Sequence, residues 1–353
     1  MNNKPRLFGI NKSNRDYTLV DTWGKNQFNT SFPAALACYM YSKQLKAVYI
    51  KADAELKRDM QYIGIDELYG VDPLGNDIYF SFETQYTPFQ KYVVGSIPRD
   101  DLVILSHDQC ISSIEIKLVA LPDNPTSTLS DDKFGSEIVV RPDTIIYLAC
   151  SFIKSYRDNM DAIRKTIGYA GRGITDWSQA IDVIPCMCEI YWAVRRMAEA
   201  INSNQSPIIM EPVWKTEGKS PRLAENCLDV FVWSNVGMLN LFMPSENETY
   251  TTITRHTRTM IWLFKMLKDY CENGRFDGEK IIDGLSYNLK NDKAFASNGQ
   301  RTHPVMTCSE LTKPRITKNE IKKIILGGGQ NLLSPERRFD AIIYNSPDLF
   351  KED

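Results

Sequence analysis

The chain is poor in the residues that build zinc sites, and it has no long apolar run. Three histidines occur in 353 residues, and the eight cysteines are scattered without a Cys-x-x-Cys pair. A zinc site is therefore not expected, and reduced thiols predict a cytoplasmic location. The opening Met-Asn-Asn-Lys-Pro-Arg lacks the apolar core of a signal peptide. No apolar run approaches the roughly 20 residues of a membrane span, so no membrane association is expected.

A surplus of positive charge is also missing. The 42 Lys and Arg residues are balanced by 44 Asp and Glu residues, which gives a formal net charge of −2. No overall basic field therefore points to nucleic acid, although a DNA-binding cleft requires only local basicity. With 43% hydrophobic residues and no repeat or long linker, the chain predicts one continuous α/β body. We expect a core in residues 1–155 and a mainly helical elaboration, packed on that core, in residues 156–353.

A β-hairpin is predicted within residues 101–120. Residues 102–107 are apolar and β-branched, residues 108–110 form a turn candidate, and apolar–polar alternation resumes over residues 111–120. Two such runs around a short turn are typical of a hairpin.

Acidic and basic side chains are expected to converge at the open end of this hairpin. Glu115 and Lys117 share one face of the second strand, and a turn of two or three residues would place Asp101 opposite Ile116 or Lys117. Carboxylates in close approach repel one another, and a divalent cation relieves that repulsion. Mg²⁺ typically binds one or two carboxylates together with waters and a substrate phosphate. The hairpin therefore predicts either a Mg²⁺ site or an ion pair on an edge strand.

Glu-x-Lys occurs four times, beginning at Glu55, Glu115, Glu217 and Glu320. The first and last lie in charged, helix-like windows that are typical of a solvated face, and the third lies in a loop bounded by Gly and Pro. Only the one at Glu115 lies on a predicted strand, between isoleucines and after an acid on the preceding strand.

Hydrogen-bond donors gather ahead of a helix predicted for residues 34–44. Ser31 is the expected N-cap of that helix, and Pro33 lies early in it. The donors include Lys25, Asn26 and Asn29. They fit either a phosphate or base contact or an ordinary hydrogen-bonded loop.

The remaining elements are predicted from periodicity and from turn residues. Strands are expected at residues 47–51, 77–82, 91–94, 137–141 and 208–214, and helices at residues 52–62, 159–168, 177–202, 250–273 and 318–326. The apolar run 144–156 fits a helix or a strand.

Five blocks of the sequence are characteristic. They are Trp-Gly-Lys-Asn-Gln-Phe-Asn-Thr-Ser-Phe-Pro (23–33), Glu-Ile-Lys-Leu-Val-Ala-Leu-Pro-Asp-Asn (115–124), Val-Val-Arg-Pro-Asp-Thr (139–144), Trp-Lys-Thr-Glu-Gly-Lys-Ser-Pro (214–221) and Ser-Pro-Glu-Arg-Arg-Phe-Asp (334–340). Together they resemble the HindVP-like, HgiDI-related family of type II restriction endonucleases, and the resemblance spans nearly the whole chain.

The resemblance implies the PD-(D/E)xK restriction-endonuclease-like fold. In that fold a mixed central sheet, flanked by helices, carries an acid on one strand and Asp/Glu-x-Lys on the next. Carried over by position, Asp101 is the first acid, Glu115 the second and Lys117 the lysine.

The sequence departs from this pattern at one point. The motif often has Pro directly before the first acid, whereas this chain has Pro98-Arg-Asp-Asp101, which leaves Asp100 as a competitor. We prefer Asp101 because it directly precedes the strand. The literal dipeptide Pro142-Asp143 follows the Glu-x-Lys and is not favoured as a metal ligand.

The resemblance also implies the chemistry. It suggests Mg²⁺ held by Asp101, Glu115 and the Ile116 carbonyl, with Lys117 orienting or deprotonating the attacking water. The product would be cleaved double-stranded DNA with 5′-phosphate ends. A short palindromic recognition sequence of the GRCGYC type, and hence a homodimer, is expected. Candidate DNA contacts are Lys25, Asn26, Asn29, Arg141, Arg172, Lys215, Lys219 and Arg222.

Two other functions fit the same residues. One is a repair or structure-specific nuclease of the same fold, and the other is a DNA-binding protein without catalysis. The complete Asp101, Glu115 and Lys117 set argues against the second.

Overall fold

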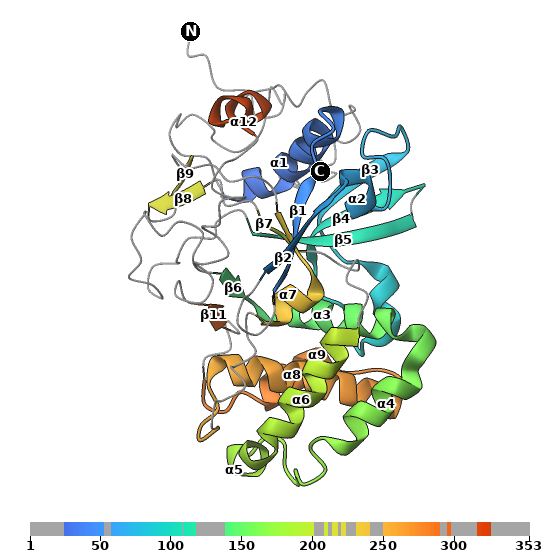
Figure 1. Cartoon of the computed structure of the whole chain (residues 1–353), viewed down its shortest axis with the longest axis vertical. Helices are drawn as coiled ribbons and strands as arrows, with labels where there is room; N and C mark the ends of the chain where they lie inside the picture. Colours follow the sequence, from blue (N-terminus) through green and yellow to red (C-terminus); the bar gives the residue numbers. More distant parts are fainter. Residues whose placement is uncertain are drawn as a thin grey trace, which may run out of the picture.

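The computed structural model describes residues 25–52, 58–107, 109–117, 138–200, 208–210, 214–217, 220–223, 231–240, 250–289, 295–297 and 316–325. In these residues the protein is a mixed α/β structure, in which a seven-stranded sheet lies between helices (Figure 1). None of the described helices has the length and apolar character needed to cross a membrane.

The main sheet is mixed and has the strand order β2-β1-β10-β7-β5-β4-β3. β1 runs parallel to β10 and β5 runs parallel to β7, whereas the other neighbours are antiparallel. Because β7 and β10 lie between β1 and β5, the sheet joins strands from both sides of residue 155. Its strands are β1 (Ala47–Ala52), β2 (Arg58–Ile63), β3 (Ile78–Thr84), β4 (Asp100–Ser106), β5 (Gln109–Lys117), β7 (Ile208–Met210) and β10 (Phe231–Trp233).

Each face of the sheet packs into its own hydrophobic core, since side chains alternate along the strands. In β1, Val48 and Ile50 enter the first core, while Ala47 and Tyr49 enter the second. The first core includes the buried sides of α3 (Pro142–Ser155), α7 (Asn235–Asn240) and α8 (Arg255–Asn273). The second includes those of α1 (Lys25–Ser42), α2 (Ile65–Tyr69) and α12 (Lys318–Ile325). The protein is thus a three-layer arrangement of helices, sheet and helices.

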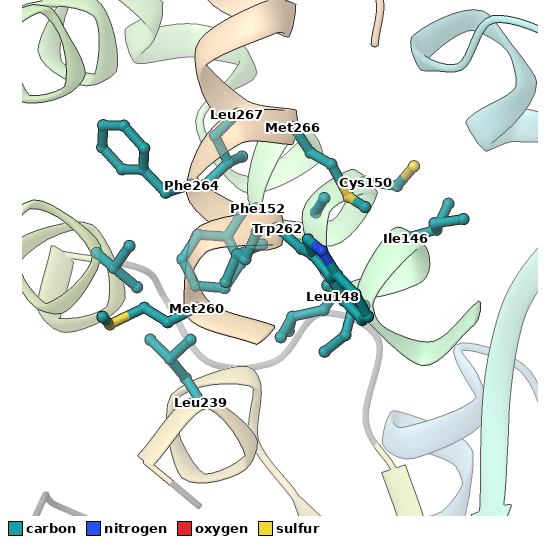
Figure 2. Close-up of a cluster of buried hydrophobic side chains, with 14 of the residues drawn as sticks. Ile146, Leu148, Cys150, Phe152, Leu239, Met260, Trp262, Phe264, Met266 and Leu267 are labelled. Atoms are coloured by element: carbon teal, nitrogen blue, oxygen red, sulfur yellow. The ribbon is translucent and has the colours of Figure 1, made fainter. Parts of the chain in front are cut away.

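A helical layer extends the first core away from the sheet (Figure 1). α8 contacts α3, α4 (Met160–Tyr169), α6 (Met187–Ala200) and α9 (Gly278–Gly284). The helix predicted for residues 250–273 is confirmed as α8, and its Met260, Trp262, Phe264, Met266 and Leu267 side chains are buried (Figure 2). The Trp262 Nε1 donates a hydrogen bond to the Leu285 carbonyl at 2.9 Å, so this indole is buried with its polar atom satisfied.

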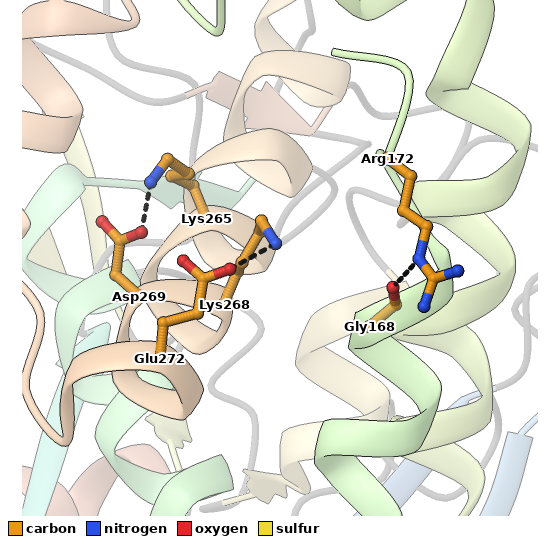
Figure 3. A network of polar contacts seen from close by, with 6 residues as sticks. All are labelled: Gly168, Arg172, Lys265, Lys268, Asp269 and Glu272. Atoms are coloured by element: carbon orange, nitrogen blue, oxygen red, sulfur yellow. Dashed lines mark hydrogen bonds and ion pairs between the residues drawn. The ribbon is translucent and has the colours of Figure 1, made fainter. Parts of the chain in front are cut away.

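The second half of α8 carries charge pairs one turn apart, Lys265 with Asp269 and Lys268 with Glu272 (Figure 3). The helix begins at a capping box made by Thr254 and ends at Gly274, whose φ is +71°. Residues 257–264 are all buried, so the first half of the helix lies in the interior and only its last turns reach the surface.

The smaller elements connect these layers. They are the 3₁₀ turns η1 (Thr87–Tyr92), η3 (Arg157–Asn159) and η4 (Ile184–Cys186), the helix α5 (Ala180–Val183), and the two-stranded pairs β6 (Ile138–Val140) with β11 (Phe295–Ser297) and β8 (Trp214–Glu217) with β9 (Ser220–Leu223).

Three sequence predictions differ from this structure. The helix predicted for residues 52–62 is wrong, because residues 58–63 pair with β1 as strand β2. The strand predicted for residues 91–94 is wrong, because residues 87–92 form η1. The first helix begins at Lys25, so Pro33 lies inside it rather than near its start. The open case, residues 144–156, belongs almost entirely to α3.

Candidate active site

The predicted hairpin is confirmed as β4 and β5, but its register differs from the expectation. Leu102 pairs with Ile114, so one further step places Asp101 across from Glu115 rather than from Ile116 or Lys117. The turn lies one residue earlier than expected, because Ser106 already pairs with Gln109. An irregularity between residues 104 and 105 then shifts the ladder by one residue.

Asp100 and Glu115 are the carboxylates that the hairpin brings together. Asp100 is only 4% exposed and shares a hydrogen bond with the Ser113 side chain. Burial, and after it the charge of Glu115, raises the pKa of the Asp100 carboxyl well above its usual range. A buried carboxyl that interacts with a second, partly buried carboxylate attracts a proton or a cation.

Asp101 lies beside this pair with a different contact. Its Oδ2 accepts a hydrogen bond from the Ile116 backbone N–H at 2.7 Å. Its own backbone N–H donates to the Asp100 Oδ1 at 3.1 Å. Asp101 therefore binds the backbone of β5 next to Glu115, and both candidate first acids lie at the start of β4.

Helix α3 meets the carboxylates at its first turn. Pro142 opens the helix, where a missing N–H costs nothing, and the Thr144 Oγ1 donates to the Glu115 Oε1 at 3.2 Å. One turn later, the Tyr147 hydroxyl donates to the Pro98 carbonyl at 2.9 Å and accepts from the Tyr86 N–H at 3.0 Å. Neither Thr144 nor Tyr147 was among the predicted site residues. The sequence feature that could have pointed to them was Pro142 at the start of an apolar run.

The Glu-x-Lys motif lies at the end of β5, where the strand has a second neighbour. Glu115, Ile116 and Lys117 pair in parallel with β7, and the Ile116 side chain is buried in the second core. For Lys117 the structure describes only the backbone. Asp143, the acid of the literal Pro-Asp dipeptide, is exposed in the first turn of α3.

A divalent cation fits the chemistry of this donor set. Within the described part of the chain, no three His, Cys, Asp or Glu side chains come together as ligands for a metal. Asp100 and Glu115 supply two carboxylates, and Mg²⁺ commonly binds proteins through one or two carboxylates, with waters and phosphate oxygens completing the shell.

The candidate DNA contacts lie in several places. Arg141 is exposed directly before α3, three residues ahead of Thr144, which contacts Glu115. Arg172 is exposed in the helical layer, with its guanidinium 4.6 Å from the centre of the Tyr169 ring and its Nε donating to the Gly168 carbonyl (Figure 3).

The other six candidates are described only in part. Lys25, Asn26 and Asn29 lie within α1, not in a loop ahead of it, and Lys215 pairs with Arg222 along the backbones of β8 and β9. For these five the structure describes the backbone, and Lys219 lies outside the described residues.

Comparisons with known proteins agree on one family. The family model described as HindVP restriction endonuclease matches residues 23–350. The chain is 44% identical to the type II restriction enzyme HgiDI of Herpetosiphon aurantiacus, covering 99% of this chain and 98% of that one. It is 46% identical to the probable type II restriction enzyme HindVP of Haemophilus influenzae, covering 99% and 96% respectively. No solved structure matches this chain. The chain therefore belongs to the HindVP restriction endonuclease family.

Proposed function

We propose that this protein is a type II restriction endonuclease, which hydrolyses phosphodiesters of double-stranded DNA with Mg²⁺ and leaves 5′-phosphate ends. The observation that carries the proposal is the buried carboxyl of Asp100 beside the partly buried carboxylate of Glu115 on the neighbouring strand. Membership of a family whose relatives are named restriction enzymes supports it. In the PD-(D/E)xK motif two acids hold the metal ion, and this is the role that we propose for the pair.

The first acid in this proposal is Asp100, with Asp101 as the alternative. Asp100 faces Ser113 and Glu115 from a buried position, whereas a carboxylate oxygen of Asp101 already accepts the Ile116 N–H. Substitution separates the two assignments. Asp100→Asn should abolish cleavage and Asp101→Asn should only weaken it, and the opposite order would return the role to Asp101.

The reaction then follows from the positions of the groups. The carboxylates and the Ile116 carbonyl would hold a divalent cation, which would supply Lewis-acid stabilisation of the phosphate and would make bound water more acidic. Thr144 orients one oxygen of Glu115 through its hydrogen bond. Lys117, two residues beyond, is assigned to orient or help deprotonate the attacking water. Attack in line with the 3′-oxygen leaves a 5′-phosphate and a 3′-hydroxyl.

Digestion of a defined plasmid tests the proposal. With Mg²⁺, the wild type should give discrete bands, and Lys117→Ala should lose cleavage while retaining DNA binding. Lys165→Ala, at an exposed position on α4, is the control and should cut normally. A smear, or cutting of branched DNA alone, would favour a repair nuclease. Binding without cleavage by the wild type with any divalent ion would favour a DNA-binding protein.

Recognition of a palindrome requires two-fold symmetry, so we propose a homodimer that reads a short sequence of the GRCGYC type. Arg141 is the candidate for a phosphate contact next to the scissile bond, because it is exposed directly before α3. Sequencing the ends of digested DNA gives the recognition site and cut position. Sedimentation of the protein with and without DNA gives its oligomeric state, and a monomer on DNA would contradict the homodimer.

A further inference from the structure

Helix α3 contacts the structures that carry both carboxylates. Thr144 donates to the Glu115 side chain at 3.2 Å, and Tyr147 donates to the backbone carbonyl of Pro98 at 2.9 Å. Pro98 lies two residues before Asp100. Residues three apart on a helix share one face, so one face of α3 touches Glu115 directly and the approach to Asp100 one turn later.

The Tyr147 hydroxyl is buried and uses both its donor and its acceptor capacity. The residue is 7% exposed, and the hydroxyl accepts the Tyr86 N–H at 3.0 Å while donating to Pro98. Burial, followed by the charge of Asp100, raises the pKa of this phenol. The hydroxyl therefore remains a protonated donor close to the carboxylates.

The rest of the segment before Asp100 is held by other groups. Gln90 accepts the Ile97 N–H at 3.2 Å and donates to the Gly95 carbonyl at 2.6 Å, and Gln85 donates to the Ile97 carbonyl at 2.7 Å. These amides anchor residues 95–97 without α3. Loss of the Tyr147 hydroxyl would therefore loosen the backbone at Pro98, just before Asp100, while residues 95–97 stay anchored.

We propose that Thr144 and Tyr147 are positioning residues, which make α3 the element that fixes the separation of the Glu115 and Asp100 carboxylates and so the affinity for the divalent cation. This inference rests on the proposed function, because it assumes that the two carboxylates hold the metal. We assign neither residue a contact with the scissile phosphate. They affect the reaction by positioning the Asp100 and Glu115 carboxylates.

Metal binding by the DNA-free protein tests the inference. Binding of Mn²⁺, followed through the spin-resonance signal of the free ion, should weaken roughly fivefold in Tyr147→Phe, the factor that corresponds to the lost hydrogen bond to Pro98. The Mg²⁺ concentration for half-maximal cleavage should rise by a similar factor. Thr144→Val should act in the same direction, and Thr144→Ser, which keeps the donor, should restore binding.

The chain provides a matched control in Tyr156, at the other end of α3. This tyrosine is also 7% exposed, and its hydroxyl donates to the Met197 carbonyl. Tyr156→Phe, which loses one hydrogen bond where Tyr147→Phe loses two, should also lower stability but leave Mn²⁺ affinity unchanged. Equal Mn²⁺ affinity in Tyr147→Phe and Tyr156→Phe would overturn the inference, as would unchanged affinity in Thr144→Val. Failure of the proposed function would appear separately, as absence of cleavage by the wild type.

Discussion

At the scale of single residues, the candidate site contains the Asp100 carboxyl, whose buried position disfavours its charged form. The folded protein raises the pKa of Asp100, so that group stabilises the fold fully below its unfolded-state pKa. The stabilisation is lost as the pH rises through the folded-state value. In the absence of metal, burial of Asp100 therefore costs the fold more at pH 8 than at pH 5.

Asp100→Asn should consequently stabilise the metal-free protein while abolishing cleavage. We expect a gain of roughly 1–2 kcal/mol at pH 8 and a smaller gain at pH 5, measured by urea unfolding with EDTA. Asp101→Asn is the control, because it removes a carboxylate that already accepts a backbone hydrogen bond, and it should not stabilise. A loss of stability in Asp100→Asn at pH 8 would contradict the cause assigned to the raised pKa.

The sequence predicted Glu115 on a strand next to an acid-bearing strand, but it favoured Asp101 over Asp100. At Asp100 the side chains of β4 do not alternate strictly between the two faces of the sheet. β3 pairs Phe82 with Leu102 and Thr84 with Asp100, and Glu83 between them has a φ of +49°. This local irregularity depends on a neighbouring strand that is distant in sequence, so a pattern read along one strand could not reveal it.

At the scale of elements, close approach of α7 to β1 requires a glycine. A Cβ atom on Gly237 would lie 2.8 Å from the Ile50 carbonyl oxygen and 2.9 Å from the Trp233 ring. Gly237→Ala should therefore destabilise the protein by roughly 1–3 kcal/mol in chemical unfolding. Gly168→Ala in α4, where no atom lies within 4 Å, is the matched control and should be neutral or stabilising. Equal effects of the two substitutions would contradict the packing argument.

A second element-scale prediction concerns α12, which is held to α1 by Glu320. The Tyr39 hydroxyl donates to Glu320, which also accepts the Thr317 N–H at 2.9 Å as part of a capping box. These hydrogen bonds, with that of Tyr39 the largest, lower the pKa of Glu320. The resulting stabilisation is complete above the unfolded-state pKa and is lost as the pH falls through the folded-state value.

Hydrogen exchange measures this effect. Exchange of α12 amides should accelerate between pH 6 and pH 3 relative to α6 amides, after correction for intrinsic rates. Thr317→Ala should weaken the helix end by about 1 kcal/mol at pH 6. An unchanged ratio of α12 to α6 protection across this pH range would rule out the role of Glu320.

Elements with strong local signals were predicted correctly, and those decided by tertiary pairing were not. The hairpin and the helix at residues 318–326 had clear patterns and are present as β4–β5 and α12. Residues 58–63 carry charges that favour a solvated helix, but six backbone pairs with β1 make them a strand. Pairing with an adjacent strand outweighs intrinsic propensity in such a segment.

At the scale of the whole molecule, the central sheet takes strands from both sides of the proposed boundary at residue 155. β7 and β10, from the later part, lie between β1 and β5 from the earlier part. A fragment of residues 1–155 would leave inner strand edges unpaired and would lack α8. We expect it to show no cooperative unfolding by circular dichroism, whereas the full chain should. Cooperative unfolding of the fragment would establish an independent domain.

The packing of α12 on α1 also has a consequence for synthesis. Ile316 and Ile324 enter the same hydrophobic cluster as Ala34, Leu36 and Met40, so residues near opposite ends of the described chain complete one core. During translation, this cluster cannot close until most of the polypeptide has left the ribosome. A nascent chain therefore remains without the finished layer beneath β4 and β5, and a DNA-cutting site on those strands would be assembled only as synthesis nears its end.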